Sequence, residues 1–534
     1  MAEKLPESML DPKTPDEVEV TDTPRKPVED PTLDIPLDRK AEGTPRNRLV
    51  AIGDSLTHGF QSGAIYNTDL SWPAIIAREM GWQKSFRYPK YFGRGGLPLN
   101  VEFLIRDLEE QLGETTRWWE SPLALFRARQ FMDEVEDYWE RGAGSTVPRI
   151  KGINHNLAMY GWDLRDALEL TAEMLEAQIL EPTDHFLKQI VENASERSAL
   201  RVLKSAQDKN GKSLTPFGAA AQLGEEGTHE KPGQGDGIET LIVLLGANNA
   251  LPSMLSLNVV WSEDGYDDLE QKERFTVWNP EHFKAELKLM VEEIKKIKAR
   301  HVILGTVPHV TIAPIARGVG SKVRKGSRYF PFYTRPWINT EDFDAKSDPH
   351  VTEQEARAID SAIDQYNDAI TEAVEAARND GLDWYLFEVA GLLDRLAARR
   401  YIDDPLARPP WWRKYELPPE LKALSPEPDS RFFVAGPEGR TQGGFFSLDG
   451  VHPTTIGYGI LAQELIDVMQ QYAGVEFYLG DGLTKRTGPV RVDFGRLISR
   501  DTLISNPPRS LTSDLGLIGW VDEVLDGIIG RLLL

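Results

Sequence analysis

The chain has 534 residues, of which 84 are acidic and 61 are basic, and its formal net charge is −23. This excess of acidic side chains argues against nucleic-acid binding and against docking on anionic lipid as the main function, because both depend on clusters of Lys and Arg. The sequence contains no cysteine, which excludes disulfides, thiolate catalysis and cysteine-based zinc sites.

The first residues lack the apolar core of a signal peptide, and no run of 18 apolar residues occurs in the chain. We therefore expect a cytoplasmic protein with no stable membrane insertion. A signal peptide removed from this sequence stays an alternative. The sequence does not indicate the oligomeric state.

Composition divides the chain into three parts. Residues 1–46 carry eight prolines and 12 acidic side chains with few large apolar residues, which predicts a disordered or loosely draped N-terminal tail. One domain is expected over 47–473. Residues 474–534 form a C-terminal extension, and apolar residues at helical spacing predict that it ends in an amphipathic helix over 518–534.

Four short apolar runs, bounded by turn residues, are typical of strands buried on both faces: 49–52, 240–245, 301–305 and 384–387. Apolar residues at helical spacing predict helices over 71–80, 163–180, 281–299, 353–379 and 456–472. Strands that alternate with helices indicate an α/β fold, in which helices cover both faces of a parallel sheet of about five strands.

Four insertions interrupt this pattern, at about 93–150, 205–237, 311–350 and 405–445. The first contains a helical-looking stretch over 122–141, and the second has the composition of a loop. The third is basic and aromatic, and includes Arg317, Lys322, Arg324, Lys325, Arg328, Tyr329, Phe330, Phe332, Tyr333 and Trp337. Long insertions in a compact domain are often functional, so we expect at least one to cover a pocket, with surface elaboration as the alternative.

A candidate nucleophile, Ser55, directly follows the first predicted strand. In open α/β sheets, ligands bind outside the carboxyl ends of the strands. Gly53 and Gly59 flank the serine and permit a tight turn with close approach of a substrate. Taken alone, a Gly-Asp-Ser sequence is more typical of an ordinary turn than of a catalytic site.

A candidate Asp–His pair, Asp449 and His452, precedes the last predicted helix. Residues three apart on one loop can share a hydrogen bond, in which the carboxylate fixes the imidazole tautomer and leaves the other ring nitrogen facing a serine. The alternative is a helix-capping aspartate beside a surface histidine.

Four blocks together resemble the SGNH/GDSL family of serine esterases and lipases. Gly53–Leu56 matches the first block, Gly-Asp-Ser-Leu, and Asp449–His452 matches the last, Asp-x-x-His. Gly246–Asn249 is similar to the Gly-x-Asn-Asp block, and Asn154–Gly161 to the block that supplies the oxyanion glycine. The blocks follow the family's order, and the resemblance covers roughly 48–470.

The resemblance implies a three-layer α/β/α flavodoxin-like fold and a set of roles. Ser55 would attack an ester carbonyl, His452 would take its proton, and Asp449 would orient His452. The backbone amides of Ser55 and Gly161 and the side-chain amide of Asn248 would hold the oxyanion. Neither a metal nor an organic cofactor is implied.

Two features depart from the family's pattern. Asn249 stands where the family usually has aspartate, and the separation between Ser55 and Gly161 is long, which leaves Gly95 or Gly96 as an alternative oxyanion glycine. Beside the nucleophile, we expect Asp54 to anchor the turn. His58 is expected to be a loop residue or part of the pocket wall, with a role as the base as the alternative.

The sequence thus predicts hydrolysis of a small carboxylic ester through an acyl-serine intermediate. It lacks the Gly-x-Ser-x-Gly elbow, the His-Glu-x-x-His zinc motif, the phosphate-binding loop and the dinucleotide-binding glycines. A carbohydrate deacetylase, a thioesterase, a lysophospholipid hydrolase and an acyltransferase stay open, since all would use the same residues. A non-catalytic binding protein on the same fold is the alternative from another class.

Overall fold

The computed structural model describes residues 5–6, 9–37, 42–113, 122–182 and 191–509. Its centre is a sheet of four parallel strands in the order β1-β5-β6-β10. All four predicted strands are confirmed: β1 (Asn47–Gly53), β5 (Ile238–Leu244), β6 (Ala299–Gly305) and β10 (Trp384–Phe387).

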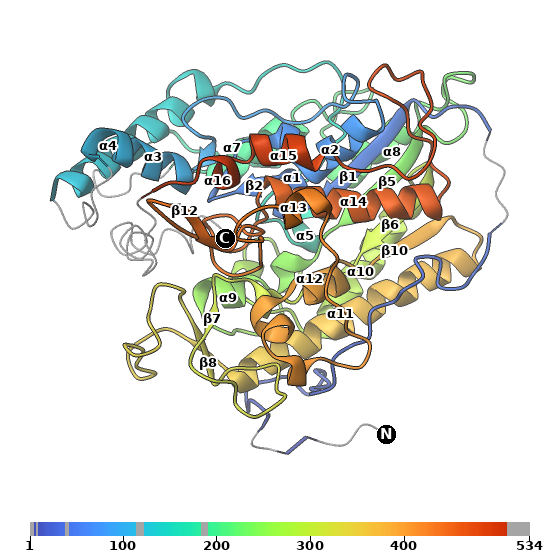
Figure 1. Ribbon diagram of the computed structural model, residues 1–534. Coiled ribbons are helices and arrows are strands. Elements are labelled where there is room, and N and C mark those ends of the chain that lie inside the picture. The colour runs from blue at the N-terminus through green and yellow to red at the C-terminus, as the bar shows by residue number, and fades with distance from the viewer. Residues whose placement is uncertain (1–4, 7–8, 38–41, 114–121, 183–190, 510–534) are drawn as a thin grey trace.

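Helices cover both faces of this sheet, because successive strand residues point to opposite sides and nearly all are apolar. One set of alternate residues packs against α2 (Trp72–Glu79) and α14 (Thr455–Gln471); it includes Leu49, Ala51, Ile242, Leu244 and Ile303. The other set packs against α8 (Pro216–Gly224), α10 (Pro280–Lys295) and α11 (Glu353–Asn379); it includes Val50, Ile52, Leu241, Val243 and Val302. Figure 1 shows the sheet between these groups of helices.

The prediction of about five strands is wrong for the regular sheet, which has four strands among the described residues. An extended segment, 155–159, runs parallel to β1 along its outer edge. The N–H of Ala51 donates to the His155 carbonyl at 2.8 Å, and the N–H groups of Leu157 and Met159 donate to the Ala51 and Gly53 carbonyls at 2.8 and 3.0 Å. The segment stays irregular because the Asn156 side chain binds the backbone N–H of Ala158 at 3.2 Å.

The predicted helices are confirmed with two corrections. Residues 163–180 form two helices, α5 (Leu164–Glu169) and α6 (Ala172–Gln178), because Leu170 is extended and Thr171 caps the second helix. The insertion 205–237 is not all loop, since it contains α8. Thr215 caps this helix, Pro216 opens it, and its small apolar residues are buried beside the sheet.

The insertions contribute helices and small antiparallel sheets around the carboxyl edge of the main sheet. The helices outside the main layers are α1 (Ser55–His58), α3 (Val101–Leu112), α4 (Pro122–Glu140), α7 (Ala194–Leu203), α9 (Pro252–Ser256), α12 (Val389–Leu396) and α13 (Pro419–Lys422). The small sheets are formed by β2 (Phe60–Gln61), β3 (Ala64–Ile65) and β4 (Leu97–Pro98), by β7 (Arg317–Gly318), β8 (Phe332–Thr334) and β9 (Val351–Thr352), and by β11 (Val434–Gly436) and β12 (Gly439–Gln442).

Residues 10–37 of the N-terminal segment follow α11 without forming a helix or strand of their own (Figure 1), and residues 42–46 bind the loop 227–230. Composition predicts a disordered or loosely draped tail, whereas the structure gives this segment specific partners. The backbone N–H of Thr21 donates to Ser361 Oγ at 3.0 Å, and Arg25 pairs with Asp368 and Glu388, both at 2.9 Å. Charged residues that favour disorder in isolation are here bound to charges on and beside α11.

The C-terminal extension packs on α14 through α15 (Phe494–Arg500) and α16 (Thr502–Ser505). Phe494 and Leu497 are buried in the same apolar cluster as α14, and the Asp501 carboxylate accepts the backbone N–H of Ile456 at 3.0 Å. The amphipathic helix predicted over 518–534 lies outside the described residues. None of the helices described is long and apolar enough to cross a membrane.

Candidate active site

Ser55 is the first residue of α1 and lies at the carboxyl end of β1. Asp54 caps this short helix: its carboxylate accepts the Leu56 N–H at 3.0 Å, which confirms that Asp54 anchors the turn. Glycine is required just before it, because a Cβ atom on Gly53 would lie 2.4 Å from the Leu244 carbonyl oxygen. The turn therefore lifts Ser55 out of the sheet at the edge where ligands bind.

Asp449 and His452 form a buried hydrogen-bonded pair. Asp449 Oδ2 lies 3.1 Å from His452 Nδ1 and accepts the Gly63 N–H at 3.1 Å. Asp449 Oδ1 accepts the N–H groups of Val451 and His452 at 2.9 and 2.8 Å. All four bonds end on one carboxylate, so its orientation relative to the imidazole is fixed.

This geometry assigns the protonation of the pair. Burial alone raises the pKa of Asp449, but the nearby His452 and the hydrogen bonds outweigh it and hold the pKa below its ordinary value. An ionised Asp449 can only accept, so the proton of a neutral His452 ring lies on Nδ1. The lone pair of Nε2 is then free to accept a proton.

Residues directly after the Ser55 turn hold the Asp449–His452 loop. The Ser62 N–H donates to Ser447 Oγ at 2.8 Å, beside the bond from Gly63 to Asp449. Tyr458 of α14 donates its hydroxyl to the Phe60 carbonyl at 2.7 Å, and the Phe60 ring lies 4.6 Å from the His452 ring. Segments almost 400 positions apart are thereby joined at one place.

The segment 154–162 binds the other side of the Ser55 turn. Asn156 Nδ2 donates to the Thr57 carbonyl at 3.0 Å, and the Tyr160 N–H donates to His58 Nδ1 at 3.3 Å. His58 Nε2 contacts the Tyr91 hydroxyl at 2.9 Å, and burial lowers the pKa of His58 to about 3. His58 is thus a neutral, buried link between the two loops, and both ring nitrogens are occupied.

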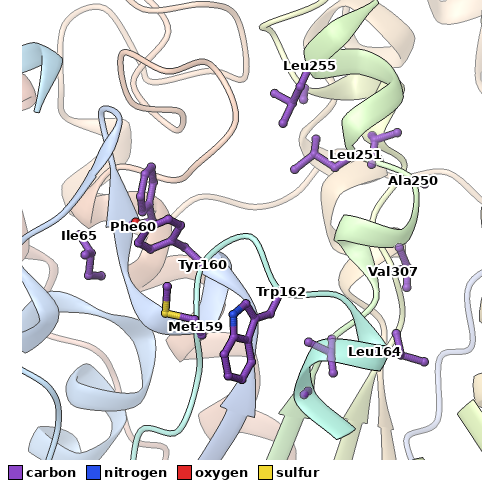
Figure 2. Close-up of a cluster of buried hydrophobic side chains, with 14 of the residues drawn as sticks. Phe60, Ile65, Met159, Tyr160, Trp162, Leu164, Ala250, Leu251, Leu255 and Val307 are labelled. Carbon is purple, nitrogen blue, oxygen red and sulfur yellow. The ribbon is translucent and has the colours of Figure 1, made fainter. Parts of the chain in front are cut away.

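The loop that follows β5 contacts the segment 154–162 through Asn248. Its Nδ2 donates one N–H to the Trp162 carbonyl at 2.8 Å, which places the amide beside the Gly161 turn, where φ is +78°. Figure 2 shows Tyr160, Trp162 and Leu251 from these loops within one buried cluster. Of the alternative glycines, Gly95 packs against Phe103 and Gly96 against the Ile65 backbone.

Ser55 and His452 line the same cavity, which has a volume of about 130 Å³. Its wall is almost entirely apolar, and includes Leu251, Val310, Val389, Leu392, Leu396, Phe445, Phe446, Ile460 and Leu461. His452 Nε2 is buried and has no hydrogen-bond partner in the described part of the chain. The bond from Ser55 to His452 is therefore not formed in this structure; such bonds are often loose without substrate and tighten in the complex.

One polar residue of this cavity, His309, gave no signal in the sequence. Its Nε2 lies 2.9 Å from Asp364 Oδ1 and its Nδ1 lies 3.6 Å from Asp394 Oδ1. Burial favours the neutral ring, but Asp364 and Asp360 outweigh it and raise the pKa of His309 to about 10. This pKa favours the imidazolium form of a buried ring in the cavity wall at neutral pH.

Burial gives Asp54 a pH-dependent effect on stability. It raises the pKa of Asp54 to about 6, against the opposing influence of the Leu56 N–H, His452 and the Ala247 N–H. A carboxyl whose native pKa exceeds its unfolded value favours folding when protonated, so this contribution to the free energy of unfolding is lost as pH rises from about 4 to about 6.

Asp54→Asn is therefore expected to change stability little at pH 4 and to raise the free energy of unfolding by about 3 kcal/mol at pH 8. The asparagine oxygen can still accept the Leu56 N–H, so the helix cap is kept. Urea unfolding of both proteins at both pH values measures this. A difference of the same size at pH 4 and pH 8 would contradict the assignment.

Within the described ranges, no group of three or more His, Asp or Glu side chains is placed to hold a metal ion. No protein-family model matches the chain, and no curated protein sequence matches it either. What the structure brings together is one cavity with a serine at a strand end, a histidine with a free ring nitrogen, and a carboxylate that orients the histidine.

Proposed function

We propose that the chain is a serine ester hydrolase of the SGNH/GDSL type, with Ser55, Asp449 and His452 as its catalytic triad. The observation that carries this proposal is the Asp449–His452 pair, whose unpartnered Nε2 lies in the wall of the cavity that Ser55 also lines. The three-layer flavodoxin-like fold of that family is part of the proposal. The four parallel strands and the edge segment 155–159 support it.

Each residue then has a defined role in the reaction. Ser55 Oγ attacks the ester carbonyl while His452 Nε2 removes its proton, and Asp449 stabilises the imidazolium that forms. The amides of Ser55 and Gly161 and the second N–H of Asn248 Nδ2 donate to the oxyanion. His452 then protonates the leaving alkoxide, and a water molecule repeats the sequence on the acyl-serine and releases the acid.

The cavity favours an apolar acyl or aryl group, because its wall offers few polar partners beyond the reacting residues and His309. Thioesters, acetylated carbohydrates and lysophospholipids stay candidate substrates, since the same three residues would act on them. We also propose a cytoplasmic location, which rests on the sequence alone.

The test is turnover of p-nitrophenyl acetate and p-nitrophenyl decanoate by the wild-type protein, followed as phenolate release. We expect turnover of both esters, with the larger kcat/KM for decanoate because its chain can occupy the apolar cavity. Added methanol distinguishes hydrolysis from acyl transfer: a methyl ester among the products indicates acyl transfer, and acid alone indicates hydrolysis. Folded protein that binds the esters and releases no phenolate would instead be a binding protein.

A further inference from the structure

A second cavity, of about 220 Å³, adjoins the first, and Ser430 lines both. We call it the arginine pocket, because its wall contains five arginines and a single aspartate, Asp403: Arg317, Arg328, Arg399, Arg400 and Arg431. The chain as a whole carries a formal charge of −23, so this concentration of positive charge runs against the composition. The arginines of the pocket lie in the basic insertion 311–350 and in the segment that follows α12.

Only two of these arginines have a carboxylate partner among the described residues. Arg431 binds both oxygens of Asp403, at 2.7 and 2.8 Å, and thereby neutralises the one acidic residue of the wall. Arg400 pairs with Asp360 at 2.8 Å. The others are held by neutral groups: Arg317 by the Ile338 carbonyl, Arg328 by the Asp22 carbonyl and Arg399 by the Gly318 carbonyl.

Several guanidinium N–H groups have no acceptor in the described structure. They are Nε of Arg317, Nε and Nη1 of Arg328, and Nη1 of Arg399 and Arg400. Arg328 and Arg400 are only 4% and 5% exposed. Burying a cation without an acceptor is costly, so a site of this kind is stabilised by an anion that supplies the missing oxygens.

Arg399 has one hydrogen-bond anchor among the described residues. Its side chain lies over the Phe330 ring at 4.7 Å and donates from Nη2 to the Gly318 carbonyl at 2.8 Å. Burial and the neighbouring Arg317 lower its pKa to about 10. The fixed guanidinium plane matches the geometry of a carboxylate or phosphate, which it can bind through two N–H groups.

The two cavities meet at Ser430. Its Oγ accepts the Ala398 N–H and donates to the Leu396 carbonyl, both at 2.8 Å, so it ties the end of α12 to the loop before β11. Leu396 lines the first cavity, and Ala397 and Ala398 line the arginine pocket. The two cavities thus share Ser430 as a wall residue, and a substrate that used both would carry an ester at one end and an anion at the other.

We propose that the arginine pocket binds an anionic group, a carboxylate or a phosphate, of the ester substrate while its carbonyl lies at Ser55. The second half of this inference, that the ester carbonyl lies at Ser55, rests on the proposed function. The substrate class that it names is an apolar ester that carries a negative charge away from the scissile bond. The pocket itself is a binding site whether or not Ser55 reacts.

Binding is tested first, in Ser55→Ala protein, by calorimetric titration with inorganic phosphate and with succinate. We expect at least one to bind, and Arg399→Gln in the same background to weaken binding about tenfold or more. Removing Arg399 leaves no carboxylate unpaired, so the variant is expected to fold, which circular dichroism checks. The anion that binds more tightly identifies phosphate or carboxylate as the natural group.

The matched control is Arg408→Gln. Arg408 is near in sequence, holds the carbonyls of Tyr401 and Ile402 at 2.8 and 2.7 Å, and lies outside the pocket wall. Anion binding is expected to be unchanged by this substitution. If neither anion binds, or if both glutamine variants weaken binding equally, there is no anion site in the arginine pocket.

The substrate half is tested with p-nitrophenyl esters of six to twelve acyl carbons, with and without a terminal carboxylate. We expect wild type to favour a carboxylate-bearing ester at one chain length, and Arg399→Gln to lower the anionic-to-neutral ratio of kcat/KM about tenfold through KM. An unchanged ratio would overturn the substrate assignment. If no ester is hydrolysed while Arg399-dependent anion binding persists, the proposed function fails and the anion site stands.

Discussion

Asp449→Asn is expected to lower kcat for any ester substrate by about 10⁴-fold at neutral pH, with the protein still folded. Asparagine has nearly the same shape, and its oxygen can still accept the backbone N–H groups of Val451 and His452. Its NH₂ group would face His452 Nδ1 and donate to it, so the ring proton would move to Nε2. A protonated Nε2 cannot take the proton of Ser55.

The chain offers a control in a further Asp–His pair, which is partly buried. Asp383 Oδ2 lies 2.7 Å from His301 Nδ1, near the amino ends of β10 and β6 and outside the wall of the first cavity. Asp383→Asn should leave kcat within about twofold of wild type, because it perturbs an equivalent bond far from the reacting groups. Equal losses of kcat in the two variants would show that Asp449 affects activity only through the stability of the folded protein.

Asn248→Ala is expected to lower kcat by about 10²–10³-fold with a smaller change in KM. One N–H of its side chain already binds the Trp162 carbonyl at 2.8 Å, and we propose that the remaining N–H donates to the oxyanion. In the proposed mechanism, that remaining donor is used only when charge develops on the carbonyl oxygen. Steady-state kinetics on the preferred p-nitrophenyl ester separates the two constants.

Asn249→Ala is the control for this variant, because Asn249 is adjacent, identical in type and fully buried. Neither polar atom of its side chain has a hydrogen-bond partner in the described structure. We expect kcat to change less than about threefold, since no donor to the oxyanion is removed. A comparable loss in both variants would mean that the loop, and not the Asn248 amide, matters.

Local sequence signals were sufficient for the strands and for the Asp449–His452 pair. A strand buried on both faces needs a continuous apolar run, and each of the four runs became a strand of the parallel sheet. The spacing of three between Asp449 and His452 brings their side chains together within a single loop. The tight turn at Ser55 likewise follows from Gly53, Asp54 and Gly59 alone.

Contacts between distant segments had no such signal. The edge segment 155–159 has no regular alternation, and its place beside β1 depends on backbone bonds to Ala51 and Gly53. His58 looks like a pocket residue from its position three after Ser55, but Tyr91 and Tyr160 occupy both of its ring nitrogens. The local sequence around His58 does not indicate these partners, which lie more than 30 and more than 100 positions away in the chain.

The polar residues in the walls of the two cavities could not be predicted from the sequence for the same reason. The pKa of His309 is raised by Asp364 and Asp360, which both lie on α11, more than 50 positions away. The arginine pocket combines the predicted basic stretch with Arg399, Arg400 and Arg431, whose proximity depends on how the insertions fold over the sheet. Composition predicted the charges of the insertion but not the cavity around which they gather.

Covalent labelling of Ser55 by an alkyl fluorophosphonate, mapped by mass spectrometry of the digested protein, is the most direct test of whether this serine is an activated nucleophile. In wild type we expect about one label per chain, on Ser55, with esterase activity lost in proportion. Ser55→Ala is expected to take up no label, and Asp449→Asn to react far more slowly. If folded wild-type protein stays unlabelled, or if the label lies on another residue, Ser55 is not the nucleophile.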